Sequence, residues 1–174
     1  MPEKITPVTD ADRAHLKACV VLAEAALEAG DEPFGSLLVD TQGCVLAEDR
    51  NRVSGGDATR HPEFALARWA AENLSPEQRA TSTVYTSGEH CAMCAAAHAW
   101  VGLGRIVYAS STPQLLSWMD RWGAGRPPIA ALRIQDVAPD VEVSGPDQDL
   151  ASEVERLHRR RLEKQGAIAA DRTQ

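Results

Sequence analysis

The chain has 174 residues, of which 44% are hydrophobic and 25% charged, as in an ordinary globular protein. The composition excludes disorder, a collagen repeat or a coiled coil as a description of the whole chain, and no apolar run approaches the roughly 20 residues of a membrane span. The formal charge of −7 argues against non-specific nucleic-acid binding, which needs clustered Lys and Arg.

Hydrophobic periodicity predicts helices and strands that alternate along the chain. The expected elements are a helix over 9–30, strands over 34–40 and 44–48, a polar loop over 50–60, a helix over 62–74, a strand over 81–87, a helix over 91–102, a strand over 105–109, a short helix near 115–119, a strand over 131–137 and a helix over 150–164. This alternation indicates an α/β protein with helices on both faces of a sheet that has parallel members.

The length fits a single domain, which we place at residues 1–165, with a frayed tail over 166–174. The N-terminus lacks the charged-then-apolar layout of a signal peptide, so we expect a cytoplasmic location and no membrane partner. Cys19 and Cys44 lie among apolar residues and are expected to be buried, inert thiols.

Two short motifs carry the chemistry, and each opens a predicted helix: His61-Pro62-Glu63 and Cys91-Ala92-Met93-Cys94. Residues three apart share a helix face, and a helix N-terminus favours thiolates, so both cysteines can bind one ion. Two thiolates and one imidazole form a common zinc set that leaves a fourth position for water. We therefore predict zinc ligands at His61, Cys91 and Cys94, with Glu63 as the general acid/base beside that water.

Neither motif is specific by itself. His-x-Glu is common by chance, and the C-x-x-C spacing also suits half of a structural zinc site or a redox pair. A structural site usually needs a fourth Cys or His, and the remaining candidates form no tidy second pair. The combination of both motifs favours a catalytic site. A non-catalytic, zinc-containing binding module is the alternative from another class, and Glu63 argues against it because a structural site has no need of that carboxylate.

These motifs resemble the zinc-dependent nucleobase and nucleoside deaminases of the cytidine deaminase superfamily, which carry H-x-E and a later P-C-x-x-C. Within that superfamily the sequence is similar to the branch of bacterial guanine deaminases and tRNA adenosine deaminases, through residues 33–40, 51–53, 94–97 and 104–108. The resemblance implies a three-layer α/β/α fold with a five-stranded mixed sheet in which strands 4 and 5 are parallel. It also implies a Zn²⁺ cofactor and a homodimer whose pockets lie near the subunit interface.

The resemblance also suggests substrate contacts. Asn51 matches the residue that holds the substrate ring, and Trp100 stands where this branch often has a pocket residue. We further expect contacts from Phe34, Glu89 and Asp120. Trp118 and Trp122 flank Asp120, and this cluster either caps the pocket or packs a dimer. The sequence departs from the family pattern at His90, which replaces Pro and is expected to face the substrate or support the ligands.

The expected reaction is hydrolytic deamination. Water attacks the ring carbon that bears the amine, Glu63 carries the proton to the ring and then to the amine, and ammonia leaves. The same chemistry serves guanine, cytosine and adenine. The acidic charge, and the acids that interleave the basic run at 156–164, favour a free nucleobase or nucleoside, with a guanine-type heterocycle preferred. A tRNA-specific adenosine deaminase is the alternative.

Overall fold

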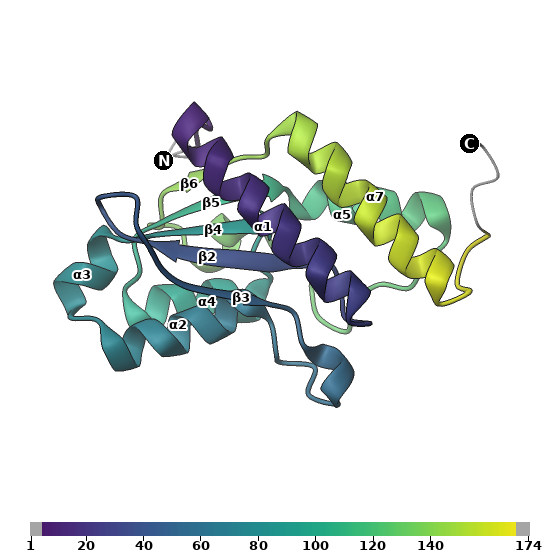
Figure 1. The fold of residues 1–174 in the computed structure, drawn as a ribbon, viewed down its shortest axis with the longest axis horizontal. Helices are drawn as coiled ribbons and strands as arrows, with labels where there is room; N and C mark the ends of the chain where they lie inside the picture. Colours follow the sequence, from purple (N-terminus) through teal and green to yellow (C-terminus); the bar gives the residue numbers. More distant parts are fainter. Residues whose placement is uncertain (1–4, 170–174) are drawn as a thin grey trace.

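The computed structural model describes residues 5–169 and has three layers, with one mixed sheet between two groups of helices (Figure 1). The strand order is β1-β6-β5-β4-β2-β3. The strands are β1 (Ile5–Thr6), β2 (Gly35–Val39), β3 (Val45–Arg50), β4 (Thr83–Gly88), β5 (Arg105–Ser110) and β6 (Val143–Ser144).

Seven α-helices and one 3₁₀ turn surround the sheet in the described residues. They are α1 (Asp10–Glu28), η1 (Val53–Gly55), α2 (Pro62–Asn73), α3 (Pro76–Thr81), α4 (Ala92–Val101), α5 (Thr112–Trp122), α6 (Ile134–Val137) and α7 (Gln148–Lys164). Helices α1 and α7 pack together over one face of the sheet, and α2 and α4 pack together over the other (Figure 1).

The sheet confirms the predicted hairpin and the parallel strands. β2 pairs antiparallel with both β3 and β4, whereas β4–β5 and β5–β6 are parallel pairs. β2 to β5 are the first four expected strands, β6 takes the place of the fifth, and the two-residue strand β1 adds a sixth at the edge beside β6. The prediction that the fourth and fifth strands run parallel is therefore confirmed.

The position predicted for the fifth strand is wrong. Residues 131–133 form no strand, and 134–137 form the short helix α6, whose Ile134 is fully buried. The strand is instead Val143–Ser144, which pairs with β5. Two residues are too short for a periodicity argument, so pairing with the neighbouring strand decides this element.

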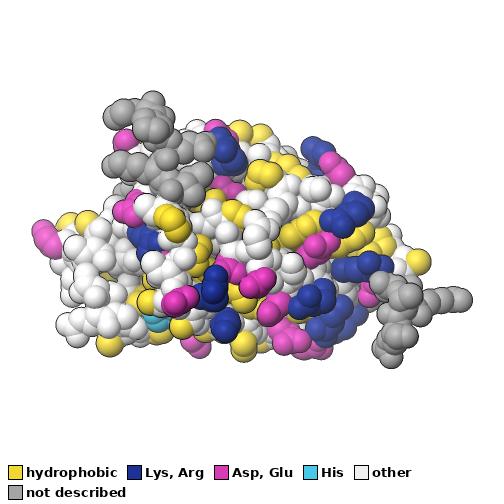
Figure 2. Space-filling model, turned by 90° about the horizontal axis from the view of Figure 1, so that it is seen from above, with side chains coloured by type: hydrophobic (Ala, Val, Ile, Leu, Met, Phe, Trp, Pro, Cys, Tyr) yellow, Lys and Arg dark blue, Asp and Glu magenta, His cyan; other side chains and the backbone are white. Residues whose placement is uncertain are grey.

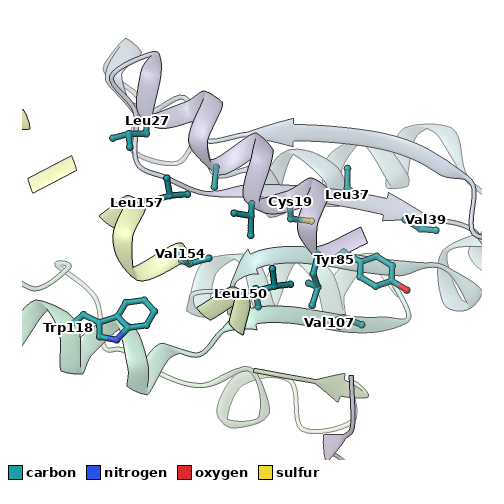
Figure 3. Packing of buried hydrophobic residues seen from close by; sticks show 14 residues of the cluster. Cys19, Leu27, Leu37, Val39, Tyr85, Val107, Trp118, Leu150, Val154 and Leu157 are labelled. Atoms are coloured by element: carbon teal, nitrogen blue, oxygen red, sulfur yellow. The ribbon is translucent and has the colours of Figure 1, made fainter. Parts of the chain in front are cut away.

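The main core lies between the sheet and the α1–α7 layer. Leu16 and Cys19 of α1 belong to one cluster with Leu37 of β2, Tyr85 of β4 and Val154 of α7. Figure 3 labels Cys19, Leu37, Tyr85 and Val154 in this cluster. Gly35 lets α1 approach closely, because a Cβ on this residue would collide with the Cβ of Leu22. The α1 helix can therefore pack directly against the start of β2.

The expectation for Cys19 and Cys44 is confirmed for one residue and wrong for the other. Cys19 is buried as predicted, but Cys44 is exposed because it belongs to the turn of the β2–β3 hairpin. The helix α3 was not predicted, since it is only six residues long.

The predicted tail falls partly on residues 170–174, which lie outside the described residues. Across residues 5–169, no helix is both long enough and apolar enough to cross a lipid bilayer.

Candidate active site

Two helix N-termini meet at one edge of the sheet, and each is preceded by a predicted metal ligand. His61 is the N-cap of α2 and Cys91 is the N-cap of α4, and both have extended backbone. Pro62 at the first position of α2 suits that start because its missing N–H would have no partner there. The parallel strands β4 and β5 end at the same edge, so β4 delivers the chain into Cys91.

His61, Cys91 and Cys94 converge as the sequence predicts. The two sulfur atoms are 3.6 Å apart, and each lies 3.6 Å from Nδ1 of His61. Tetrahedral zinc with Zn–S near 2.3 Å and Zn–N near 2.0–2.1 Å separates its ligand atoms by roughly 3.5–3.8 Å. The donor types and their mutual spacing therefore fit a zinc ion. Among the described residues, the cluster of His, Cys, Asp or Glu side chains that could hold a metal consists of these three residues.

The two thiols differ in acidity. Hydrogen bonding with Cys94 and with the ring of His61 lowers the pKa of Cys91 to about 4, against the opposing effect of burial. The contact with Cys91, together with burial and nearby Glu63, raises the pKa of Cys94. The Cys91 contact also raises the pKa of His61. A bound cation displaces protons from such groups, so metal binding at this site releases protons.

Glu63 is buried directly beside the metal ligands. Its side chain is 6% exposed, and its Oε2 lies 3.6 Å from the sulfur of Cys94. The other oxygen, Oε1, lies 2.8 Å from the hydroxyl of Thr86 and 3.3 Å from that of Ser36. Burial raises the pKa of Glu63, although His61 and the Thr86 hydrogen bond favour the ionised form. A raised carboxyl pKa beside a metal site suits a group that takes up and gives back a proton.

Asn51 and Phe34 also lie at this edge of the sheet. Asn51 follows β3 and is completely buried, with its Oδ1 accepting a hydrogen bond from the backbone of Val53 at 3.1 Å. Its Nδ2 has no hydrogen-bond partner among the described residues. The ring of Phe34 packs on the backbone of Gly88, because a Cβ there would lie 2.8 Å from Cε1 of Phe34. Asn51 thus offers a buried, unused donor for a ligand.

The other three predicted contacts have different surroundings. Trp100 is at the far end of α4 from Cys91 and is 88% exposed. Glu89 uses both carboxylate oxygens on backbone N–H groups, of Thr112 at 2.7 Å and Ile134 at 3.0 Å, so it joins α5 to α6. Asp120 is exposed and forms an ion pair with Arg126 at 2.6 Å. Among the described residues, the polar partners given for Glu89 and Asp120 are not the metal ligands, and the contacts predicted between these three side chains and the substrate stay predictions.

The aromatic cluster and His90 occupy interior positions. Trp118 is buried in the main core, and Trp122 packs against the same core. His90 is buried, and its ring contacts that of His98 edge-on at 5.4 Å between centroids. It does not belong to the group of three ligand atoms.

Sequence reasoning missed Ser36, Thr86 and His158. Ser36 and Thr86 are paired across β2 and β4, and both are fully buried. Ser36 could have been noticed as the one hydroxyl residue of β2, whereas Thr86 lies in β4 beside other hydroxyl residues and does not stand out. His158 of α7 is buried between Phe34, at 4.9 Å between ring centroids, and Trp118, at 6.3 Å. Nothing in the local sequence distinguishes His158 from the charged residues around it.

Comparison with known proteins identifies the family. Residues 9–110 match the family described as "Cytidine and deoxycytidylate deaminase zinc-binding region". The chain is 29% identical to a probable cytosine deaminase of Schizosaccharomyces pombe over 81% of this chain and 87% of that protein. It is 36% identical to the guanine deaminase of Bacillus subtilis over 55% of this chain and 62% of that protein.

A solved structure agrees with these relatives. The structure of a tRNA:A34 deaminase, from a study of A-to-I editing at the wobble position, superposes with a TM-score of 0.61. It is 26% identical and covers 83% of this chain and 99% of its own. The match spans both predicted motifs, and the His/Cys/Cys ligand set is assembled in the fold. The chain therefore belongs to the cytidine and deoxycytidylate deaminase zinc-binding family, as a zinc-dependent deaminase that hydrolyses C–N bonds.

Proposed function

We propose that this enzyme deaminates a free nucleobase or nucleoside, with Glu63 as the proton carrier. The observation that carries the proposal is the position of this carboxylate. It is buried beside the sulfur of Cys94 at 3.6 Å, while Thr86 and Ser36 hold the oxygen on its other side. A purely structural metal site has no use for a carboxylate here, because burying a charged group costs folding free energy.

The residues divide the chemistry between them. His61, Cys91 and Cys94 would hold zinc, which when bound lowers the pKa of water at its open position to about 7. Glu63 accepts one proton of the attacking water through Oε2 and gives it to a ring nitrogen. It then takes the remaining proton from the new hydroxyl group on the ring carbon and gives it to the amine, which leaves as ammonia as the carbonyl forms. Asn51 donates a hydrogen bond from Nδ2 to an acceptor on the heterocycle, and Phe34 packs against the substrate from the start of β2. Trp100, Glu89 and Asp120 are not assigned to this step.

The charges on α7 favour a small substrate over tRNA. Arg160 forms ion pairs with Glu24 at 3.0 Å and Glu28 at 2.6 Å, and Lys164 pairs with Glu28 at 2.9 Å. Arg161 pairs with Glu32 at 3.3 Å. Figure 2 shows basic and acidic side chains next to one another on this face. A phosphate backbone would have to compete with these carboxylates for the same cations.

The preferred heterocycle is guanine-type. This choice is supported by the 36% identity to a guanine deaminase across the segment that carries both motifs. The longer similarity to a probable cytosine deaminase makes cytosine the second candidate. We also propose a homodimer, as the family resemblance implies, and a cytoplasmic location, as expected from the N-terminal sequence. The predicted contact of Trp100 with substrate would then require the pocket of a partner subunit, because this side chain lies away from its own triad.

Ammonia release from a substrate panel tests the proposal. The panel holds guanine, cytosine and adenine, their ribonucleosides, and an anticodon stem-loop with adenosine at the wobble position. We expect turnover of at least one free base or nucleoside by the zinc-loaded protein, and none by a Glu63→Gln control. Efficient deamination of the stem-loop with an untouched base panel would instead establish the tRNA alternative.

A further inference from the structure

The direction of the buried side-chain amide of Asn51 depends on the conformation of the loop that carries it. Asn51 begins the segment that connects β3 to α2, and this segment contains no regular element apart from η1. Its backbone N–H donates to the carbonyl of Phe34 at 3.0 Å, which ties it to the start of β2. Its Oδ1 binds only the next turn of the same loop, at Val53. The orientation of Nδ2 therefore depends on what holds residues 51–54.

The buried carboxylate of Asp31, which is not itself part of this segment, binds it through hydrogen bonds. Oδ1 of Asp31 accepts a hydrogen bond from the backbone N–H of Ser54 at 2.8 Å, and Oδ2 accepts one from Nη1 of Arg50 at 2.8 Å. The same Nη1 donates to the carbonyl of Asn51 at 3.0 Å. Asp31 itself is tied to the end of α1, because its backbone N–H donates to the carbonyl of Ala26 at 2.9 Å. Arg50 and Asp31 thus bracket Asn51 on both sides.

We propose that the Asp31–Arg50 ion pair is a positioning device for Asn51 and so for the substrate ring. This inference rests on the proposed role of Asn51 in holding the heterocycle. Asp31 touches neither the metal ligands nor the reacting atoms, and it acts through the loop. The pair anchors the loop to α1, the helix that Gly35 holds against β2.

The electrostatics support a pair that persists at neutral pH. The side chain of Asp31 is 4% exposed and that of Arg50 is 23% exposed, so water screens the pair weakly. Burial acts to raise the pKa of Asp31, but hydrogen bonds from Ser54 and Arg50 outweigh it and lower the pKa. The carboxylate is therefore ionised when the enzyme works, and its hydrogen bonds to Arg50 and Ser54 are charge-assisted.

The Asp31→Asn variant tests this device with little change of shape. Its amide oxygen can still accept from Ser54, but its amide nitrogen would face the Arg50 guanidinium, donor against donor. Asp40→Asn is the matched control, because Asp40 accepts from the backbone N–H groups of Gln42 and Cys44 at 2.9 Å in the distant hairpin turn. Both variants are made in the native protein and in Asn51→Ala.

The probe is the compound of the substrate panel with the highest kcat/KM. We expect Asp31→Asn to lower kcat/KM about tenfold in the native background and by less than twofold in Asn51→Ala, with zinc content unchanged. Non-additivity of this kind marks residues that act through one another. Amide hydrogen exchange should accelerate over residues 51–54 in Asp31→Asn, and Asp40→Asn should leave both measurements unchanged.

Two results overturn the inference, and they differ in what else they overturn. If Asp31→Asn costs the same factor in both backgrounds, Asp31 acts independently of Asn51 and the positioning role is wrong, while the proposed function stands. If Asn51→Ala keeps the native kcat/KM, the substrate role of Asn51 fails, and the positioning role fails with it.

Discussion

The hydroxyl of Thr86 lies 2.8 Å from Oε1 of Glu63, which connects β4 to the first turn of α2. This contact occupies one oxygen of the carboxylate and leaves Oε2 on the side of the metal ligands, 3.6 Å from the sulfur of Cys94. Ser36, which is paired with Thr86 in the sheet, lies 3.0 Å from the same hydroxyl. The two strands therefore set the orientation of the carboxylate.

Replacing Thr86 with Val should lower kcat/KM about tenfold, since a hydrogen bond to a charged group contributes roughly 1.5–3 kcal/mol. The shape of the side chain is kept, so zinc content should not change. Steady-state ammonia release measures the effect. Thr83→Val in the same strand is the control, because Thr83 lies at the opposite end of β4. Equal activity of the two variants would contradict the orienting role of Thr86.

The Glu63→Gln variant should retain zinc and lose turnover. Gln keeps the shape of the side chain but cannot accept the proton, and a general acid/base contributes typically 10²–10⁴-fold. Zinc is measured by elemental analysis and turnover by ammonia release on the same preparation. Near-normal release from zinc-loaded Glu63→Gln protein would falsify the proton-transfer role.

The Cys91→Ala variant should bind less than one zinc per chain and unfold at a lower temperature, because metal binding is coupled to folding. Elemental analysis and a thermal melt measure the two effects. Cys44→Ala is the matched control, since Cys44 is exposed in the hairpin turn and belongs to no metal group. Undiminished zinc in Cys91→Ala would show that the ligand assignment is wrong.

Substituting Arg159, Arg160 and Arg161 together with Ala should leave turnover of a free base within about twofold. These residues pair with acids on α7, on α1 and in the loop that follows α1. Exposed pairs of this kind contribute roughly 0.2–1 kcal/mol each, so the melting temperature should fall modestly. Turnover of the free base should respond little to moderate salt. A steep salt dependence, lost in the triple variant, would point to a phosphate-bearing substrate instead.

Stability at low pH should depend on Asp12. Burial disfavours its charge, but hydrogen bonds from Arg105, Thr9 and Tyr85 outweigh that effect and lower its pKa from 3.8 to about 2. A carboxyl with a lowered pKa stabilises the fold above its unfolded pKa, and this contribution is lost as the pH falls from about 4 to about 2. The shift corresponds to about 2 kcal/mol.

Urea unfolding of the wild type and Asp12→Asn measures that contribution. The difference in free energy of unfolding between them should be largest at neutral pH and should shrink between pH 4 and pH 2. Asp10→Asn is the control, because Asp10 is fully exposed beside Arg13. A difference that stays constant down to pH 2 would exclude the ion pair with Arg105 as its source.

Local sequence patterns were sufficient for the elements that begin or end at strong signals. Pro62 at a helix start, Gly102 after α4 and the Thr41–Gly43 turn mark boundaries that the structure places within a few residues of the expected ones. These signals act over one or two turns of chain and need no partner. The fifth strand failed because Val143 and Ser144 become a strand only by pairing with β5.

The sequence by itself determined the types of metal ligand and the position of the carboxylate proposed as general acid/base, because spacings of two and three residues at a helix start place those side chains at one end of each helix. Only the tertiary structure decided which of the other candidates join them. Trp100 lies nine residues beyond Cys91 and so roughly 13 Å along the helix axis. Both carboxylate oxygens of Glu89 accept hydrogen bonds from backbone N–H groups. Ser36 and Thr86 lie beside Glu63 because the register of β2 and β4 pairs these two residues. Helix packing and strand register are long-range properties, and no local pattern in the chain encodes them.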